Sequence, residues 1–300
     1  MKSSNRGETM LTPTRVFISV PSSGWLPPEQ LDIKNGVIDR VRLAGFEPQE
    51  FLTSGDFTKL AWSHENLQYR LGRCQGAVIL GLVRWEGWDI HKKPYKFNTA
   101  YNHYEGALAL AKSIPTFILM HEHVHKAGIA LKGRSQYFVK LPDRVNSSWL
   151  QTDEFVSTFD KWVDRVKNRH HIFLGYSSKA QTTATKIKGF LTSKGVSVMD
   201  QEVNLDPATS MVDEIERAAK SCMGSIFLFT KDDETITRDN LIFAAGYFMH
   251  AKGTDKTLII REEGARMPVD MGRHIFPLQS RDNISPIEKG LEKFTDYLTE

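Results

Sequence analysis

Short apolar runs alternate along the chain with longer segments of helical periodicity, and the whole series occurs twice. The first half opens on a strand-length apolar run at 16–20, and the second half opens on one at 172–176. Each half closes on a helical segment whose apolar residues recur at i, i+4, i+7 and i+11, the spacing of one helical face. Strands that are apolar on both faces and alternate with helices are typical of a mostly parallel sheet with helices on both sides. We therefore expect two tandem α/β domains with mostly parallel sheets, 15–169 and 170–300, after a flexible leader at 1–14.

The third element of the series carries the polar residues of most interest. It is a helical segment at 101–109 in the first half and at 239–248 in the second, each followed by an apolar strand. When the copies are aligned, Glu105 stands opposite Ala244, although an asparagine lies one residue nearer this position in the first copy. Ligands of parallel α/β sheets bind at the carboxyl ends of the strands. We therefore expect this segment, with the loops that follow the neighbouring strands, at a ligand-binding rim.

Composition narrows the class of protein. Of the 300 residues, 40% are hydrophobic and 25% are charged, as in ordinary globular proteins, and the formal net charge is only +3. No run of like charges indicates a nucleic-acid-binding arm or an acidic tail, so charge alone names no partner. The longest apolar runs have the length of strands, and residues 1–14 lack the apolar core of a secretory signal. We expect a cytoplasmic protein without a membrane span.

Cysteine and histidine give no indication of a metal centre. Cys74 and Cys222 occupy matching positions of the two copies, which favours small buried residues over a redox pair, and two cysteines are too few for a disulfide framework. His121, His123 and His125 alternate along the chain, but no further ligand is obvious nearby, so a polar loop is favoured over a metal site. We expect no metal and no prosthetic group.

Three segments of the second half, taken together, carry a family resemblance. The segments 229–234, 238–248 and 267–272 resemble, in order and spacing, the TIR domains of bacterial CBASS and Pycsar anti-phage effectors, over roughly residues 170–298. The family pattern in the central segment is Asn, two apolar residues, Phe, Glu, any residue, Gly, Tyr, Phe, and every position agrees except Ala244. The resemblance implies a flavodoxin-like or Rossmann-like fold.

The resemblance also implies an activity and a site. Domains of this family cleave the nicotinamide–ribose bond of NAD, and the infected cell is thereby sacrificed in abortive infection. A carboxylate beside the ribose stabilises the cationic centre that develops there, which an alanine methyl cannot do. We therefore predict that the chain with Ala244 is inactive or nearly so, and we interpret the alanine as a deliberate Glu-to-Ala substitution, the alternative being a natural pseudoenzyme. The other substrate-contact candidates are Gly175, Tyr176, Ser177, Ser178, Asp232, Asp233 and Asn240.

The first half has a less specific resemblance. Its segment from Glu105 to Pro115 is similar to the Glu-x-Gly-x-Ala segment of nucleoside deoxyribosyltransferase-like and TIR-like domains, except that the glycine follows the glutamate directly. Two readings stay open. One is a sensor domain for a nucleotide second messenger or another phage-induced signal, which assembles the TIR domains into a homo-oligomer or filament. The other is a second N-glycosidic site, or a non-catalytic module. The ligand candidates of this half are Ser19, Ser22, Arg84, Trp85 and Glu105. The sequence names neither the activating signal nor the product, linear or cyclic ADP-ribose.

Overall fold

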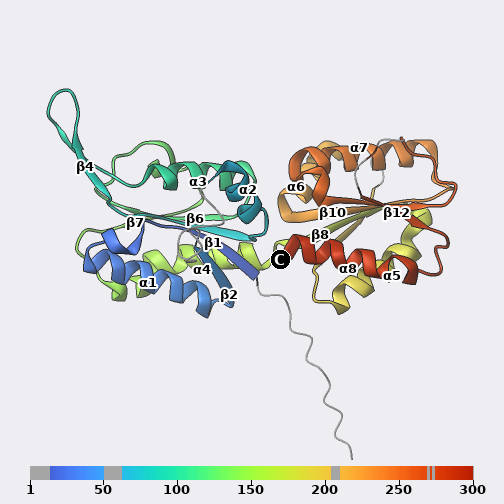
Figure 1. The fold of residues 1–300 in the computed structure, drawn as a ribbon, viewed down its shortest axis with the longest axis horizontal. Coiled ribbons are helices and arrows are strands. Elements are labelled where there is room, and N and C mark those ends of the chain that lie inside the picture. The colour runs from blue at the N-terminus through green and yellow to red at the C-terminus, as the bar shows by residue number, and fades with distance from the viewer. Residues whose placement is uncertain (1–13, 51–62, 204–209, 269–270, 272–273, 300) are drawn as a thin grey trace, which may run out of the picture. The chain divides into compact units, whose positions relative to one another are not determined.

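The computed structural model describes residues 14–50, 63–203, 210–268, 271 and 274–299. It divides into two units, Pro13–Asn168 and Arg169–Glu300. Each unit is a three-layer α/β domain with its own apolar core on each face of a central sheet (Figure 1).

The N-terminal unit has a five-stranded parallel sheet in the order β2-β1-β3-β6-β7. Helices α1 and α4 cover one face, and α2 and α3 cover the other (Figure 1). An antiparallel hairpin, β4 and β5, is inserted before α3. The strands are β1 (Thr14–Ser19), β2 (Phe46–Glu50), β3 (Gly76–Gly81), β4 (Trp85–Trp88), β5 (Pro94–Phe97), β6 (Thr116–His121) and β7 (Tyr137–Leu141). The helices are α1 (Pro28–Leu43), α2 (His64–Gly72), α3 (Ala100–Ala111) and α4 (Asp153–Lys167).

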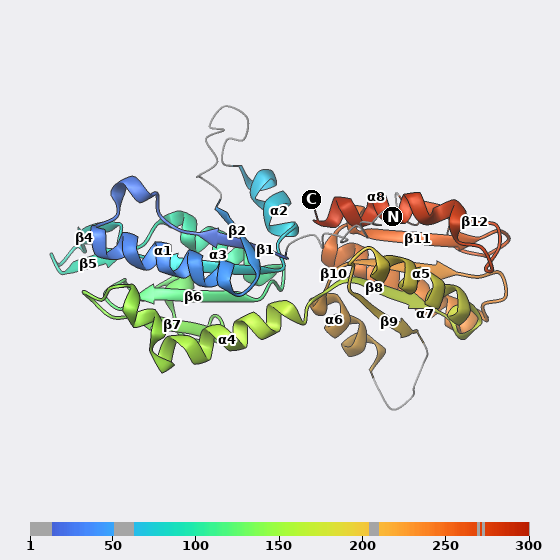
Figure 2. The same ribbon diagram turned by 90° about the horizontal axis from the view of Figure 1, so that it is seen from below.

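The C-terminal unit repeats this plan with the strand order β9-β8-β10-β11-β12, again all parallel. Helices α5 and α8 cover one face, and α6 and α7 cover the other, as Figures 1 and 2 show. The strands are β8 (His170–Tyr176), β9 (Val198–Glu202), β10 (Cys222–Phe229), β11 (Thr257–Glu262) and β12 (His274–Leu278). The helices are α5 (Gln181–Ser193), α6 (Met211–Ser221), α7 (Thr235–Lys252) and α8 (Ser285–Thr299).

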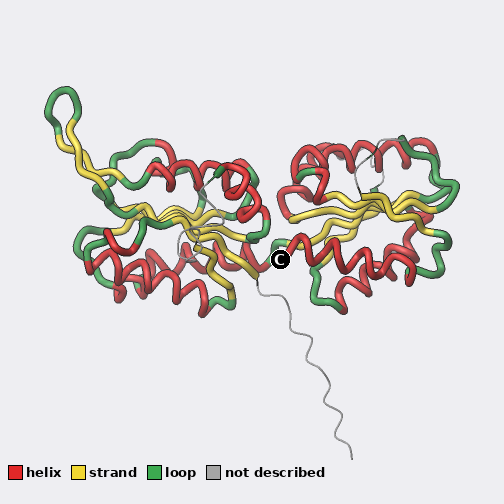
Figure 3. The backbone as a smooth tube through the Cα atoms, viewed as in Figure 1, coloured by secondary structure: helices red, strands yellow, loops and turns green. Residues whose placement is uncertain are grey.

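The strand order identifies the fold. With the hairpin set aside and the strands of each unit counted in chain order, both sheets run 2-1-3-4-5, which is the flavodoxin-like doubly wound order. The strands lie in the middle layer of each unit between two layers of helices (Figure 3). The expectation of two tandem α/β domains with parallel sheets is confirmed, because strands apolar on both faces must be covered on both sides.

The two cysteines are buried, as their matching positions predicted. Cys222 is the first residue of β10, and burial raises the pKa of its thiol to about 12, so the thiolate that reacts with oxidants is scarce at neutral pH. In the part of the chain that the structure describes, no helix combines the length and the apolarity of a membrane span.

Half-buried His171 should make the C-terminal unit less stable in mild acid. Its Nδ1 accepts the backbone N–H of Ser197 at 3.0 Å, and burial, reinforced by the positive charges of His170 and Arg169, lowers its pKa from 6.5 to about 4. Between these two values the unfolded chain binds a proton that the folded unit does not. Stability should therefore be fully present above pH 6.5 and fall as the pH drops towards 4, by at most about 3 kcal/mol.

Urea denaturation of the C-terminal unit at pH 7, 5.5 and 4.5 measures this effect. The variant His171→Gln keeps an amide at the site but does not titrate, so its stability should fall less over the same range. If the curves of the two proteins are parallel, the protonation of His171 does not limit stability.

Candidate functional site

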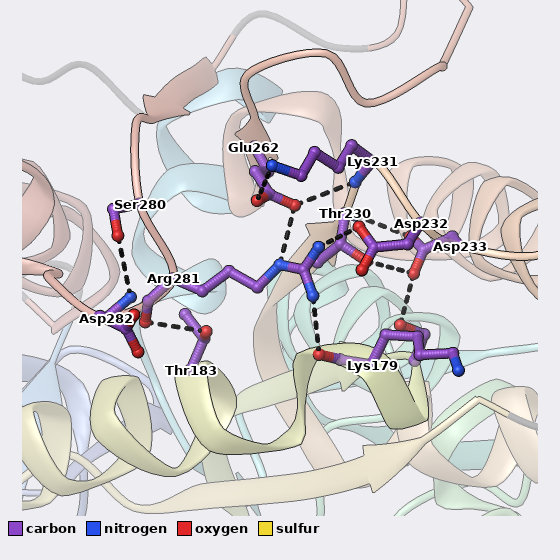
Figure 4. Close-up of polar contacts among 11 residues, drawn as sticks. Lys179, Thr183, Thr230, Lys231, Asp232, Asp233, Glu262, Ser280, Arg281 and Asp282 are labelled. Carbon is purple, nitrogen blue, oxygen red and sulfur yellow. Dashed lines mark hydrogen bonds and ion pairs between the residues drawn. The ribbon is translucent and has the colours of Figure 1, made fainter.

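Arg281 organises the carboxyl-end rim of the C-terminal unit (Figure 4). It follows β12, and each nitrogen of its guanidinium has an acceptor. Nε donates to Glu262 Oε2 at 2.8 Å, Nη1 donates to the carbonyl oxygen of Lys179 at 3.3 Å, and Nη2 donates to Asp232 Oδ1. The hydrogen bond from Arg281 lowers the pKa of Asp232 below its usual value. The ends of four strands are thus joined, because Lys179 follows β8, Asp232 follows β10, and Glu262 ends β11.

Asp233 closes the loop after β10. Its carboxylate accepts the backbone N–H of Thr230 at 2.7 Å, the hydroxyl of Thr230, and the hydroxyl of Ser177. Ser177 lies in the loop after β8 and is 1% exposed. Of the two roles open for Asp232 and Asp233, ribose binding or loop capping, the contacts favour capping, since both carboxylates already have protein partners.

The structure does not place Gly175 and Tyr176 on the exposed rim. A Cβ on Gly175 would lie 2.7 Å from the ring of Phe227, so packing requires glycine there. The ring of Tyr176 belongs to the apolar core on the α5 face, and its hydroxyl lies 3.4 Å from Asp200. In this structure the Tyr176 ring packs in the core instead of facing the rim, so its contact with a ligand stays a prediction. Ser178 is exposed, at the start of a 3-10 turn.

Helices α3 and α7 bury their residues with the same spacing, i, i+3, i+4 and i+7. In α3 these residues are Asn102, Glu105, Gly106 and Ala109. In α7 they are Leu241, Ala244, Ala245 and Phe248. The structure therefore supports the pairing of Glu105 with Ala244, and it pairs Asn102 with Leu241 rather than with Asn240.

Ala244 is fully buried in the apolar core between α7, α6 and the sheet. Ala244 is the tenth residue of α7, which begins directly after the rim loop. It therefore lies on the buried face of the helix, away from the exposed rim. Asn240, one turn earlier, has a buried Nδ2 without a hydrogen-bond acceptor. A buried amide donor ordinarily has a partner, so Asn240 is the residue of α7 best placed to donate to a group that enters from the rim.

The N-terminal unit keeps polar groups at the corresponding positions. Asn102 Nδ2 donates to Ser19 Oγ at 2.8 Å, and Asn102 also forms a capping box with Thr99 at the start of α3. Glu105, one turn further, is 5% exposed. Nearby in sequence, Asn98 is 4% exposed, and neither its Oδ1 nor its Nδ2 has a hydrogen-bond partner. The end of β1 is thus contacted by the buried amide of Asn102, and Glu105 lies on the same buried face of α3.

The strand registers also show which residue of β8 corresponds to Ser19 of β1. Val16 pairs with Gly76 in one sheet and Ile172 pairs with Gly224 in the other. When the two glycines are superposed, as the sequence repeat aligns them, Ser19 corresponds to Gly175. Where the N-terminal unit has Ser19, Asn102 and Glu105, the C-terminal unit therefore has glycine, leucine and alanine.

The remaining candidates of the N-terminal unit lie at its surface or in the β4–β5 hairpin. Ser22 is exposed and precedes a short 3-10 turn. Arg84 lies over the ring of Trp85 with its Cζ at 4.3 Å from the centroid, and Trp85 opens the β4–β5 hairpin, which extends from the body of the unit (Figure 1). A pocket of about 490 Å³ at this rim is lined by none of the candidates; its polar residues include Gln30, Glu86, Lys96, His121, Asp143 and Arg144.

Two of the three alternating histidines lie together, because His121 and His123 both approach the carboxylate of Asp143 and their ring centroids are 5.6 Å apart. His121 ends β6, is buried, and has its Nε2 at 3.3 Å from Asp143 Oδ1, while burial lowers its pKa. His125 instead packs edge-on against Tyr95, with ring centroids 4.7 Å apart. Within the described ranges, no three histidine, cysteine or acidic side chains converge as metal ligands would.

Sequence reasoning missed Arg281, Glu262 and Lys179. Glu262 gave a weak signal, since it is a carboxylate at the end of an apolar strand where the rim was expected. Arg281 and the backbone of Lys179 gave none.

The C-terminal unit is similar to a described protein family and to one curated relative. Residues 171–276 match the family described as CAP12/Pycsar effector protein, TIR domain. Over 135 residues, 42% of this chain and 42% of the relative, the sequence is 27% identical to CD-NTase-associated protein 12 of a Lachnospiraceae bacterium. The chain therefore matches less than half the length of that relative.

Two solved structures resemble one unit only distantly. A diflavin flavoprotein A3 from Nostoc sp. is 15% identical with a TM-score of 0.31, over 44% of this chain and 92% of that chain. A flavodoxin-like domain from Synechococcus sp. is 17% identical with a TM-score of 0.30, over 43% of this chain and 95% of that chain. The fold assignment rests on the strand order of the two sheets.

Proposed function

We propose that the chain belongs to a signal-activated effector of prokaryotic antiviral defence whose C-terminal unit, a TIR domain of the CBASS and Pycsar type, hydrolyses NAD at the nicotinamide–ribose bond. The match of residues 171–276 to that family carries the proposal. Loss of NAD would end the infected cell in abortive infection. The test is nicotinamide release from NAD once a glutamate stands at position 244.

The chemistry of this reaction explains why position 244 matters. Breaking the glycosidic bond leaves positive charge on the ribose, and a carboxylate beside the ring stabilises that charge more in the transition state than in the ground state. Ala244 offers no charge and no hydrogen bond. The proposed consequence is that the chain as it stands holds NAD without cleaving it, with the Asn240 amide and the rim around Ser178 as the groups nearest the substrate.

The N-terminal unit is proposed to receive the signal. The name of the relative associates that protein with a CD-NTase, a nucleotidyltransferase, which supports a nucleotide second messenger as the signal here. The exposed Trp85 and the Arg84 guanidinium stacked on it suit a base and a phosphate. Assembly into a homo-oligomer or filament in the cytoplasm would then activate the TIR domain.

A second candidate activity rests on Glu105. This carboxylate lies on the same buried face of α3 as Asn102, whereas α7 of the other unit has alanine and leucine at the matching positions. A buried carboxylate with amide neighbours is suited to a sugar with a developing charge, so the N-terminal unit is the alternative seat of an N-glycosidase or deoxyribosyltransferase.

The variant Glu105→Gln discriminates between the two activities, because it keeps the size of the side chain and removes the charge. If the N-terminal unit only binds, the variant should leave nucleoside and NAD turnover unchanged in both the Ala244 chain and the Ala244→Glu chain. If Glu105 is catalytic, turnover measured by liquid chromatography of the released base should fall about a thousandfold. Ser157→Ala, an exposed change in α4 of the same unit, is the control.

A further inference from the structure

The turn after β8, which holds Ser178, and the loop after β10, which leads into the helix of Asn240, are joined by a side chain that belongs to neither. Arg281 donates to the Lys179 carbonyl oxygen, in the turn after β8, and to Asp232, in the loop after β10. A second link between the same loops is the hydrogen bond from Ser177 to Asp233. Figure 4 shows the guanidinium between these segments and Glu262.

Two roles are open to an arginine at the rim of such a site. It can bind an anionic group of the substrate, or it can fix the protein groups that do. Three of the five guanidinium N–H groups of Arg281 already have protein acceptors, so a substrate phosphate that drew the guanidinium away would leave Asp232 and Glu262 without this partner. Glu262 is 4% exposed and also accepts the backbone N–H of Lys231 at 3.0 Å. A buried carboxylate deprived of its guanidinium partner is strongly destabilising, which disfavours displacement.

We propose that Arg281 is a positioning residue for NAD, which acts by fixing the loop after β10 against the turn after β8 at the spacing the substrate requires. The proposal rests on the proposed function. A planar guanidinium suits the task because it meets three acceptors in fixed directions, whereas a lysine ammonium is a point charge on a flexible stem. The expected consequence is a loss of substrate affinity with little change in the chemical step.

NAD binding to the full chain measures this directly, because Ala244 leaves the substrate intact under the proposed function. Two variants are compared. Arg281→Gln removes the charge, and Arg281→Lys keeps the charge but removes the planar guanidinium. We expect calorimetry to give a dissociation constant raised about tenfold for Arg281→Gln and an intermediate value for Arg281→Lys. The matched control is Lys186→Ala, since Lys186 contacts only Asp282 among the residues of Figure 4.

The two possible failures of this experiment contradict different proposals. If the parent chain fails to bind NAD, the proposed function is overturned. If the parent binds NAD and Arg281→Gln binds it equally well, the positioning role is overturned.

A merely structural role is separated by kinetics in the Ala244→Glu chain. Positioning predicts that Arg281→Lys raises KM and leaves kcat within about threefold, whereas partial unfolding lowers the apparent kcat at unchanged KM. Circular dichroism and the thermal midpoint report the folded fraction of each variant. An unchanged KM in a fully folded Arg281→Lys variant contradicts the proposal.

Discussion

Replacing Ala244 with glutamate should raise NAD cleavage by the activated protein about a thousandfold, because one preorganised group that meets developing charge contributes two to three orders of magnitude or more. The measurement is mass spectrometry of NAD and nicotinamide in phage-infected cells and with the purified chain. The new carboxylate replaces a methyl that is 0% exposed, so its entry needs a polar partner, and the unpaired Nδ2 of Asn240 one turn away is the candidate.

Two matched variants isolate the charge and the position. Ala244→Gln introduces the same shape without the charge and should remain inactive. Ala245→Glu introduces the same charge at the next residue, which is equally buried in the same helix, and should also remain inactive. NAD loss in all three variants would show that the activity does not depend on a carboxylate at position 244, and intact NAD with the glutamate would overturn the NADase proposal.

The fold could be predicted from the sequence because its determinants are local and repeated. Strands such as 77–80 and 226–229 are fully buried on both faces, and that pattern requires covering helices. The pairing of Glu105 with Ala244 was also accessible, since two copies of one helix were available for alignment. The structure strengthened it by showing the same burial spacing in both helices.

The arrangement of the rim could not be predicted in the same way. Arg281 meets Asp232 across 49 residues and Lys179 across 102 residues of sequence, and no local pattern encodes such pairings. The sequence therefore left Asp232 and Asp233 open between binding and capping, and only the contacts of the folded chain favour capping. The sequence placed Tyr176 correctly at the end of its strand, but the direction of its ring depends on packing against neighbouring strands and helices.

Trp162→Ala should destabilise the N-terminal unit by about 3–5 kcal/mol, because a fully buried large aromatic side chain leaves a cavity that the surroundings fill only in part. Trp162 packs against Phe159 and Phe117 with ring centroids at 5.3 and 5.9 Å, and its Nε1 donates to the Pro115 carbonyl oxygen at 3.0 Å. Truncation thus also leaves a buried carbonyl without its donor. Differential scanning calorimetry of the full chain is the measurement.

Two control variants and the two unfolding transitions show how much of the stability loss comes from buried volume and which unit is destabilised. Trp162→Phe keeps a six-membered ring but loses the N–H donor and part of the buried volume, so it should cost less than the alanine variant, about 1–3 kcal/mol. Trp88→Ala removes the same side chain where it is 71% exposed and should change stability by about 0.5 kcal/mol or less. Because each unit has its own cores, only the transition of the N-terminal unit should move. An equal shift of both transitions would show instead that the two units unfold as one cooperative body.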